Sequence, residues 1–366
     1  MARLIAALSG GVDSAVAAAR MVDAGHEVTA IHLALSRNPL TYRTGSRGCC
    51  SLEDANDARR VADLLSIPYY VWDFSEEFHT EVVEDFLSEY ARGRTPNPCL
   101  RCNEKIKFAA LCDRALGLGF DGVVTGHYAR LVTRGDGVVE MHRGIDMGKD
   151  QSYVLGVLTQ EQLRHSWFPL GDSVKEDVRR QARERGIKVA DKPDSYDICF
   201  IPEGDTADYL HDKLGYAPGD IEDETGAVLG HHQGTFAYTI GQRKGLHIGT
   251  PAPDGRPRYV LRLDPASRIV TVGPHEHLKV TGLTGVNPLW CDQAPTEPFD
   301  ATVQLRAHAN EIPAHISVDD AIVSIDLAHP AFGIAPGQTA VIYCGTRVVG
   351  SATIDSTSPG AQAVRP

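Results

Sequence analysis

The chain has 366 residues, enough for two or three domains. Its composition, with 42% hydrophobic and 23% charged residues, is typical of a soluble globular protein, and no apolar stretch approaches the length of a membrane span. The net charge of −12 argues against a protein that coats nucleic acid non-specifically, although it allows a local basic surface.

The chain opens on an apolar run, Arg3 to Leu8, that is typical of a buried strand. No signal peptide precedes it, so we expect a cytoplasmic protein. The sequence SGGVDS at residues 9–14 separates this strand from a helical pattern at 15–21. Glycines let a backbone approach an anion closely, and the N-terminus of the following helix attracts negative charge. We therefore expect a phosphate-binding loop, and its lack of lysine excludes the loop of kinases and GTPases.

Strand and helix patterns alternate through the first half of the chain. Further strands are predicted at 27–35, 69–72 and 122–125, and further helices at 52–65, 76–90 and 103–116. This order predicts an α/β fold, a doubly wound parallel sheet with helices on both faces. Ligands of such sheets bind beyond the carboxyl ends of the strands. We assign this catalytic domain to residues 1–210.

The pattern changes after about residue 205, where short β-branched runs replace helices. They lie at 259–263, 268–272, 301–305, 321–325, 340–343 and 347–353. We predict a small central β-rich domain at 211–280 and a C-terminal β-barrel-like domain at 281–356. Residues 357–366 are predicted to form a disordered tail.

Three cysteines stand out from the eight. Cys99 and Cys102 form a CxxC pair in a stiff loop, and Cys102 falls where the next helix is expected to begin, a position that lowers the pKa of a thiol. The segment 92–107 contains five basic residues and a single acidic one, Glu104, so we predict a basic patch there. The third cysteine, Cys199, lies in ICFIP at 198–202. Unrelated buried thiols and a structural zinc site, which lacks an obvious fourth ligand, are alternatives to redox, sulfur-carrying or iron–sulfur chemistry.

The motifs together resemble the tRNA-specific 2-thiouridylase family of the ATP-pyrophosphatase superfamily. They are SGGVDS at 9–14, GCCS at 48–51, TPNPCLRCN at 95–103, TGHYAR at 125–130, KDQSYVL at 149–155, ICFIP at 198–202 and TIGQRKGL at 239–246. The resemblance implies an enzyme that replaces the 2-oxygen of the wobble uridine with sulfur. The uridine oxygen would attack the α-phosphate of ATP, releasing pyrophosphate, with Mg²⁺ bridging the phosphates.

Nucleotide contacts follow from the same resemblance. The residues implied are Ala7, Leu8, Ser9, Gly10, Gly11, Val12, Asp13, Ser14, Leu33 and Gly126. Asp13 has two alternative roles: holding Mg²⁺, or orienting the loop.

For the sulfur step, the resemblance assigns a persulfide to Cys199 and the partner nucleophile to Cys102, with a Cys102–Cys199 disulfide as the product. Cys99 departs from the family pattern, because many members have Asp at this position. Cys99, Cys102 and Cys199 are alternatively three ligands of a [4Fe–4S] cluster. Both mechanisms remain open at this stage.

The resemblance also implies contacts with tRNA. The residues are Pro96, Asn97, His127, Lys149, Asp150, Gln151, Arg243, Lys244, Arg306 and Gln338. His127 is alternatively a core or nucleotide-contacting histidine. The run 305–309 lacks the aromatic residue that relatives carry there, which removes a stacking surface. The expected partners are tRNA with lysine, glutamate and glutamine acceptors and a cysteine desulfurase or sulfur-relay protein, and we favour a monomer.

Three other functions compete with this one. ATP-pyrophosphatases that transfer nitrogen, such as GMP or NAD synthetases, share the loop but need neither the three thiols nor the basic turn at 239–246. A non-catalytic RNA-binding module would have no need of an intact loop. A tRNA thiolase acting at another position fits the chemistry, but the order of the motifs argues against it.

Overall fold

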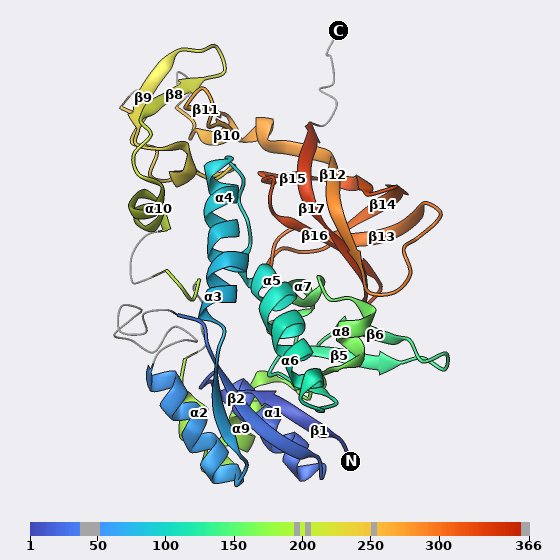
Figure 1. Cartoon of the computed structure of the whole chain (residues 1–366). Helices are drawn as coiled ribbons and strands as arrows, with labels where there is room; N and C mark the ends of the chain where they lie inside the picture. The colour runs from blue at the N-terminus through green and yellow to red at the C-terminus, as the bar shows by residue number, and fades with distance from the viewer. Residues whose placement is uncertain (37–51, 194–197, 202–205, 250–254, 360–366) are drawn as a thin grey trace.

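Three sheets organise the chain, shown in Figure 1. The computed structural model describes residues 1–36, 52–193, 198–201, 206–249 and 255–359. The motif GCCS at 48–51 lies outside these residues. None of the helices in the described part of the chain combines the length and apolar character that a membrane crossing requires.

The first sheet is parallel throughout and has the order β3-β2-β1-β4-β7. Its strands are β1 (Arg3–Ala7), β2 (Glu27–Ala34), β3 (Tyr69–Asp73), β4 (Gly122–Val124) and β7 (Ser166–Trp167). The helices α1 (Val12–Asp23), α2 (Leu52–Leu65) and α9 (Lys175–Glu184) cover one face. The other face is covered by two longer helical runs. The predicted doubly wound α/β sheet is therefore confirmed.

The alternation of side chains along β1 explains why both faces need cover. Leu4 and Ala6 pack with α1, α2 and α9, whereas Ile5 packs with Phe86 and Leu111 of the two helical runs. Ile5 is fully buried, and burying such a side chain contributes about 1.5–3 kcal/mol.

The two helical runs each contain a π-helical stretch. The first run comprises α3 (Ser75–Phe78), η1 (His79–Glu84) and α4 (Asp85–Ala91). The second comprises α5 (Pro98–Cys102), η2 (Asn103–Ala110) and α6 (Leu111–Gly117). The wider turns of η1 and η2 contact each other, so the helices bracket one apolar layer above the sheet.

A four-stranded sheet of order β10-β11-β8-β9 follows in the chain. Its elements are α10 (Thr206–Leu214), β8 (Gly219–Asp223), β9 (Val228–His232), η4 (Thr235–Ala237), β10 (Tyr259–Asp264) and β11 (Ile269–Gly273). Figure 1 shows it beyond the end of α4, away from the parallel sheet. Its small core contains Ile221, Val260 and Val270, all fully buried.

Six antiparallel strands form the C-terminal barrel, which closes because β12 pairs with both β15 and β17. The elements are η5 (His275–Leu278), β12 (Lys279–Trp290), β13 (Phe299–Gln304), β14 (Ile312–Asp319), β15 (Ile322–Phe332), β16 (Thr339–Cys344) and β17 (Arg347–Pro359). The β-barrel prediction is confirmed. One detail was wrong: residues 357–359, assigned to a disordered tail, pair with β12 as part of β17.

A hairpin from the first predicted domain joins the barrel sheet. It consists of β5 (Ala129–Thr133) and β6 (Val139–Arg143), and β6 pairs with β17 through His142 and Arg347. The remaining short helices are α7 (Ser152–Leu155), α8 (Gln160–Arg164) and η3 (Lys188–Asp191). The catalytic half and the barrel are thus joined through shared hydrogen-bonded strands.

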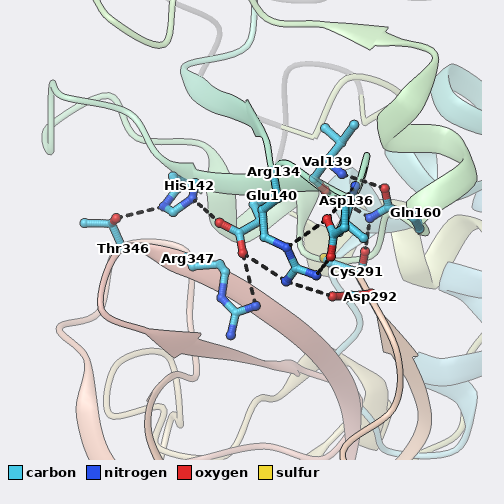
Figure 2. Close-up of polar contacts among 11 residues, drawn as sticks. Arg134, Asp136, Val139, Glu140, His142, Gln160, Cys291, Asp292, Thr346 and Arg347 are labelled. Atoms are coloured by element: carbon cyan, nitrogen blue, oxygen red, sulfur yellow. Dashed lines mark hydrogen bonds and ion pairs between the residues drawn. The ribbon is translucent and has the colours of Figure 1, made fainter.

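Charged side chains reinforce this junction (Figure 2). The carboxylate of Glu140 on β6 lies 3.4 Å from Arg134, 3.4 Å from Arg347 and 3.2 Å from His142. Arg134 also lies 3.3 Å from Asp292, which follows β12. Because Glu140 is shared by an arginine of the hairpin and an arginine of the barrel, it is the centre of the network.

Replacing Glu140 with glutamine is expected to lower the free energy of unfolding by about 1 kcal/mol, because two arginines lose their shared, mostly buried carboxylate. Urea unfolding followed by tryptophan fluorescence measures this change. Salt should reduce the difference from the wild type. Asp136→Asn is the matched control, because Asp136 pairs with Arg134 inside the same turn. Equal losses in the two variants would contradict a role for Glu140 in joining hairpin and barrel.

Candidate active site

The predicted phosphate loop follows β1 and begins α1. Ser14 Oγ donates to the carbonyl of Gly11 at 3.1 Å and accepts from the N–H of Ser9 at 3.2 Å. Gly10 has a φ of +76°, which glycine adopts without strain. Gly11 is the N-cap of α1 and makes no side-chain cap. The first N–H groups of α1 are therefore not satisfied by a capping side chain, as an anion site requires.

Two glycines allow this loop to be packed closely by its neighbours. A Cβ on Gly10 would lie 2.5 Å from the carbonyl oxygen of Asp54 at the start of α2. A Cβ on Gly126, in the loop after β4, would lie 2.6 Å from the backbone of both Asp13 and Ser14. Because backbone atoms would have to move to make room for a Cβ at Gly10 or at Gly126, both positions require glycine.

Asp13 is held by two partners from distant parts of the chain. The hydroxyl of Tyr128 donates to Oδ1 at 2.8 Å, and Lys175 Nζ lies 2.6 Å from Oδ2. Of the two roles considered for Asp13, these contacts fit the orienting role. A single carboxylate already paired with an ammonium group is a poor ligand set for Mg²⁺, which would depend mainly on the phosphates of ATP.

A second lysine reaches the loop from the segment before Cys199. Lys192 Nζ lies 2.7 Å from Asp54, 3.0 Å from Asp57 and 3.4 Å from the carbonyl oxygen of Gly10. Burial opposes the charged form, but the hydrogen bonds to the two aspartates outweigh it and raise the pKa of Lys192. The sequence analysis missed this lysine, because 182 residues separate it from Gly10.

The structure corrects the predicted position of Cys102. The helix begins at Pro98, because Asn97 accepts a hydrogen bond from the N–H of Cys99 at 3.0 Å and so caps it. Cys102 therefore lies at the end of α5, inside a continuous helical run, and Cys99 occupies the first turn. Cys99 is exposed, whereas Cys102 is buried.

One hydrophobic cluster connects the thiols with the nucleotide side of the sheet. Leu33 and Cys102 belong to it, and Ala7 and Cys199 pack against it. Two of the predicted nucleotide residues, Ala7 and Leu33, thus share one apolar environment with the two predicted sulfur-handling residues, whereas Leu8 and Val12 belong to the cluster on the other face.

The three thiols do not form a metal-ligand set in this structure. Among the residues described, no group of three or more His, Cys, Asp or Glu side chains is placed to hold a metal ion. Cys99 is exposed whereas Cys102 is buried, which does not fit the [4Fe–4S] hypothesis.

The predicted basic patch at 92–107 is largely neutralised by acidic residues that sequence proximity did not reveal. Arg94 pairs with Glu89 at 2.7 Å and with Asp355 at 2.9 Å. Arg101 pairs with Asp85 at 2.8 Å and with Glu104 at 3.1 Å. The patch is therefore a wrong prediction for these two arginines, which hold helices and barrel together.

His127 is buried, a position that fits the core alternative among the roles considered for it. Its ring packs against Phe108 and Phe168, and Nδ1 lies 2.7 Å from Thr125 Oγ1. Burial, followed by the positive charge of Lys107, holds the pKa of His127 well below its usual value. It is therefore neutral at physiological pH.

Asp150 is also buried, with 5% of its side chain exposed. Its carboxylate lies 2.7 Å from Arg143 and accepts from Ser152 Oγ at 2.7 Å, so both of its polar contacts named here are within the protein. The adjacent Gln151 accepts a hydrogen bond from the N–H of Tyr128 at 3.0 Å. Lys149 and Gln151 are partly exposed.

A cleft of about 340 Å³ lies between the barrel, the central β-rich region and the loop that precedes α5. Thr95 lies on its catalytic side, Tyr259 on its central side, and Arg306 and Gln338 on its barrel side. Gln338 Nε2 donates to the carbonyl oxygen of Thr95 at 2.5 Å. The cleft thus brings together two predicted tRNA-contact residues with the segment that carries the CxxC pair.

The other predicted tRNA residues lie at or near the surface. Pro96 and Asn97 are half-buried, and Arg243 and Lys244 are exposed on the turn that follows residues 239–241 of the cleft wall.

Family models match three consecutive parts of the chain. Their descriptions are tRNA methyl transferase HUP domain for residues 2–203, tRNA methyl transferase PRC-barrel domain for 207–274 and Aminomethyltransferase beta-barrel domain for 280–354. A crystal structure of a 4-thiouridine synthetase–RNA complex with bound ATP matches 56% of this chain and 46% of that chain, with 16% identity and a TM-score of 0.35.

Two curated relatives match nearly the whole chain. The tRNA-specific 2-thiouridylase MnmA of Nocardioides sp. (strain ATCC BAA-499 / JS614) is 66% identical over 360 residues, which cover 97% of this chain and 98% of that protein. The protein of the same name from Acidothermus cellulolyticus is 62% identical, with 97% of this chain and 98% of that protein covered. From its three matched domains and these relatives, the chain belongs to the tRNA-specific 2-thiouridylase family.

Proposed function

We propose that this protein is a tRNA uridine 2-sulfurtransferase. It uses ATP to adenylate the C2 oxygen of the wobble uridine and then replaces that oxygen with sulfur, releasing AMP and pyrophosphate. One observation carries the proposal: Ala7 and Leu33, on the nucleotide side, share a single hydrophobic cluster with Cys102 and Cys199. The 66% identity to a tRNA-specific 2-thiouridylase supports the same reaction.

The loop at residues 9–14 would bind the phosphates of ATP. Its N–H groups and the N-terminus of α1 attract negative charge, and Lys175 and Lys192 bring ammonium groups to its edge. The uridine oxygen attacks the α-phosphorus, and the bond to pyrophosphate breaks. Mg²⁺, when bound, would neutralise phosphate charge and would be held mainly by the phosphates, while Asp13, held by Tyr128 and Lys175, orients the loop.

The sulfur step uses the two clustered thiols. The outer sulfur of a Cys199 persulfide attacks C2 of the adenylated uridine, and AMP leaves with the former C2 oxygen. The thiolate of Cys102 then attacks Cys199 Sγ, which breaks the S–S bond and leaves the outer sulfur on the base. The product is a Cys102–Cys199 disulfide, which an external thiol must reduce.

Two other thiols are unsuited to this chemistry. Burial raises the pKa of Cys112 to about 11 and that of Cys291 to about 12, so both stay protonated at physiological pH. This supports the choice of Cys102 and Cys199 as the reacting pair.

The tRNA would lie across this cleft. Arg243 and Lys244 are available to phosphates, and Arg306 and Gln338 line the cleft. Thr95 also lines the cleft, and its buried hydroxyl has no hydrogen-bond partner among the described residues. We expect lysine, glutamate and glutamine tRNAs as substrates, in the cytoplasm, with sulfur delivered by a cysteine desulfurase or a relay protein.

Gly126→Ala is expected to raise the KM for ATP on the order of tenfold, about 1.4 kcal/mol, because the new Cβ displaces the backbone of Asp13 and Ser14. ATP-dependent pyrophosphate release measures it. Gly117→Ala is the control, since a Cβ there meets nothing within 4 Å. An unchanged KM in Gly126→Ala would mean that the loop position does not determine ATP binding.

Nucleoside mass spectrometry on unmodified lysine tRNA tests the function directly. With ATP, Mg²⁺ and a sulfur source, the protein should form 2-thiouridine, and without ATP it should form none. Cys102→Ala and Cys199→Ala should each abolish the product and leave tRNA affinity within a few-fold. Cys344→Ala, a half-buried thiol of the barrel, is the matched control. Thiolation that survives in Cys199→Ala would contradict the sulfur route.

Cys99→Asp separates the two sulfur mechanisms. Cys99 is exposed and lies outside the shared cluster, so the variant should keep thiolation activity if sulfur travels on Cys199. Under the cluster mechanism the same change removes an iron ligand and abolishes activity. Iron content after anaerobic purification completes the comparison. About four irons per chain, together with loss of activity in Cys99→Asp, would overturn the persulfide route.

A further inference from the structure

We propose that the ring pair of His275 and Phe332 is a stacking site for an unpaired nucleobase of the tRNA substrate. This inference rests on the proposed function and names a contact within it. The two rings are stacked, with their centres 4.8 Å apart and their planes 17° from parallel. Tyr259 meets His275 edge-on, with the ring centres 5.2 Å apart. All three rings line the cleft between the barrel and the central β-rich region.

Phe332 is an aromatic residue that the barrel core does not bury. The neighbouring Ala331 packs in that core, and successive side chains of a strand point to opposite faces, so Phe332 lies on the outside of the barrel. The residue is 42% exposed, and His275 is exposed as well. Every nucleobase has a π-face, and stacking on a protein ring contributes about 5–150-fold in affinity per base. The exposed ring pair is therefore a surface on which a base can stack.

The charges around the ring pair favour a nucleic acid. Arg306 lines the cleft, and none of the described residues that line it carries a carboxylate. Arg306 donates a hydrogen bond to the carbonyl oxygen of Gly333, next to Phe332, and its guanidinium group has further N–H donors for a phosphate. Arg243 and Lys244 are exposed on the turn that continues the cleft wall. A ligand with both aromatic rings and negative charges fits these groups, and a tRNA loop offers both.

The position of the cleft indicates which part of the tRNA supplies the base. Thr95 lines the cleft and belongs to the same loop as Cys99 of the CxxC pair. The wobble uridine of the proposed reaction lies in the anticodon loop, whose unpaired bases can be splayed onto protein rings. The ring pair therefore takes a base of that loop, close to the target uridine. The run 305–309 contains no Phe, Tyr or Trp, so Phe332 supplies a ring beside Arg306 that this run lacks.

Backbone contacts hold the two rings in place before a ligand binds. The N–H of Gly333 donates to the carbonyl oxygen of Leu278 at 3.0 Å, which ties the end of β15 to η5, the short helix that begins at His275. Gly241 of the cleft wall lies against Gly333, where a Cβ would be 3.2 Å from the Cα of Gly241. Because the rings are already stacked, a base that binds there does not have to order them first.

Phe332→Leu tests the site, with Tyr216→Leu as the matched control. Tyr216 is 73% exposed and stacks on His211 with ring centres 4.9 Å apart, and it is not among the residues that line the cleft. Fluorescence anisotropy measures the dissociation constant of unmodified lysine tRNA. Phe332→Leu should raise this constant by about fivefold or more, the low end of what base stacking contributes. Phe332→Tyr, which keeps the ring, and Tyr216→Leu should retain the wild-type affinity.

The salt dependence separates stacking from loss of charge. Phe332→Leu should weaken binding by the same factor at every salt concentration. Arg306→Gln should instead lower the slope of log affinity against log salt by about 1, because it removes a phosphate contact. An unchanged dissociation constant in Phe332→Leu, an equal loss in Tyr216→Leu, or lost thiolation with unchanged tRNA affinity would each overturn the stacking site. Absence of 2-thiouridine with the wild-type protein would instead overturn the proposed function itself.

Discussion

The backbone contact between Gly126 and the peptide joining Asp13 to Ser14 determines how the rest of the site is built. Strands β1 and β4 are adjacent and parallel, so the loops that follow them leave the sheet at the same edge. The absence of a Cβ at Gly126 lets the two loops touch. Because of this contact, Tyr128, two residues later, is close enough to reach Asp13, and Gln151 lies next to Tyr128.

A second constraint concerns the sulfur chemistry. The two thiols proposed to react, Cys102 and Cys199, come from segments far apart in the chain, and both lie in or against one apolar cluster on one face of the sheet. The π-helical stretch η2 begins directly after Cys102. Such wider turns are frequent at functional sites, because they change the direction of the side chains around them. The helical run therefore places Cys102 in the apolar cluster above the sheet, while Thr95, shortly before the run begins, lines the cleft.

Local patterns predicted much of the fold, since β1, β2, β3, β4 and most barrel strands carry their own pattern; β7, with only two residues, was not predicted. The hairpin β5–β6 was missed, because it takes its place by pairing with β17, about two hundred residues further along the chain. Long sequence separation also explains which contacts of the candidate site were missed. The loop residues 9–14 form a local motif, but Lys175 lies 162 residues from Asp13 and has no sequence signal of its own. The neutralisation of Arg94 by Asp355 could not be predicted either.

The central claim is that the C2 oxygen of uridine leaves with AMP from an adenylated base. Lysine tRNA carrying ¹⁸O at C2 of the wobble uridine tests it most directly. After ATP-dependent thiolation, mass spectrometry of the released AMP should show one ¹⁸O for each 2-thiouridine formed. Unlabelled AMP, with the label in water or retained in the thiolated tRNA, would contradict adenylation of the base at this loop.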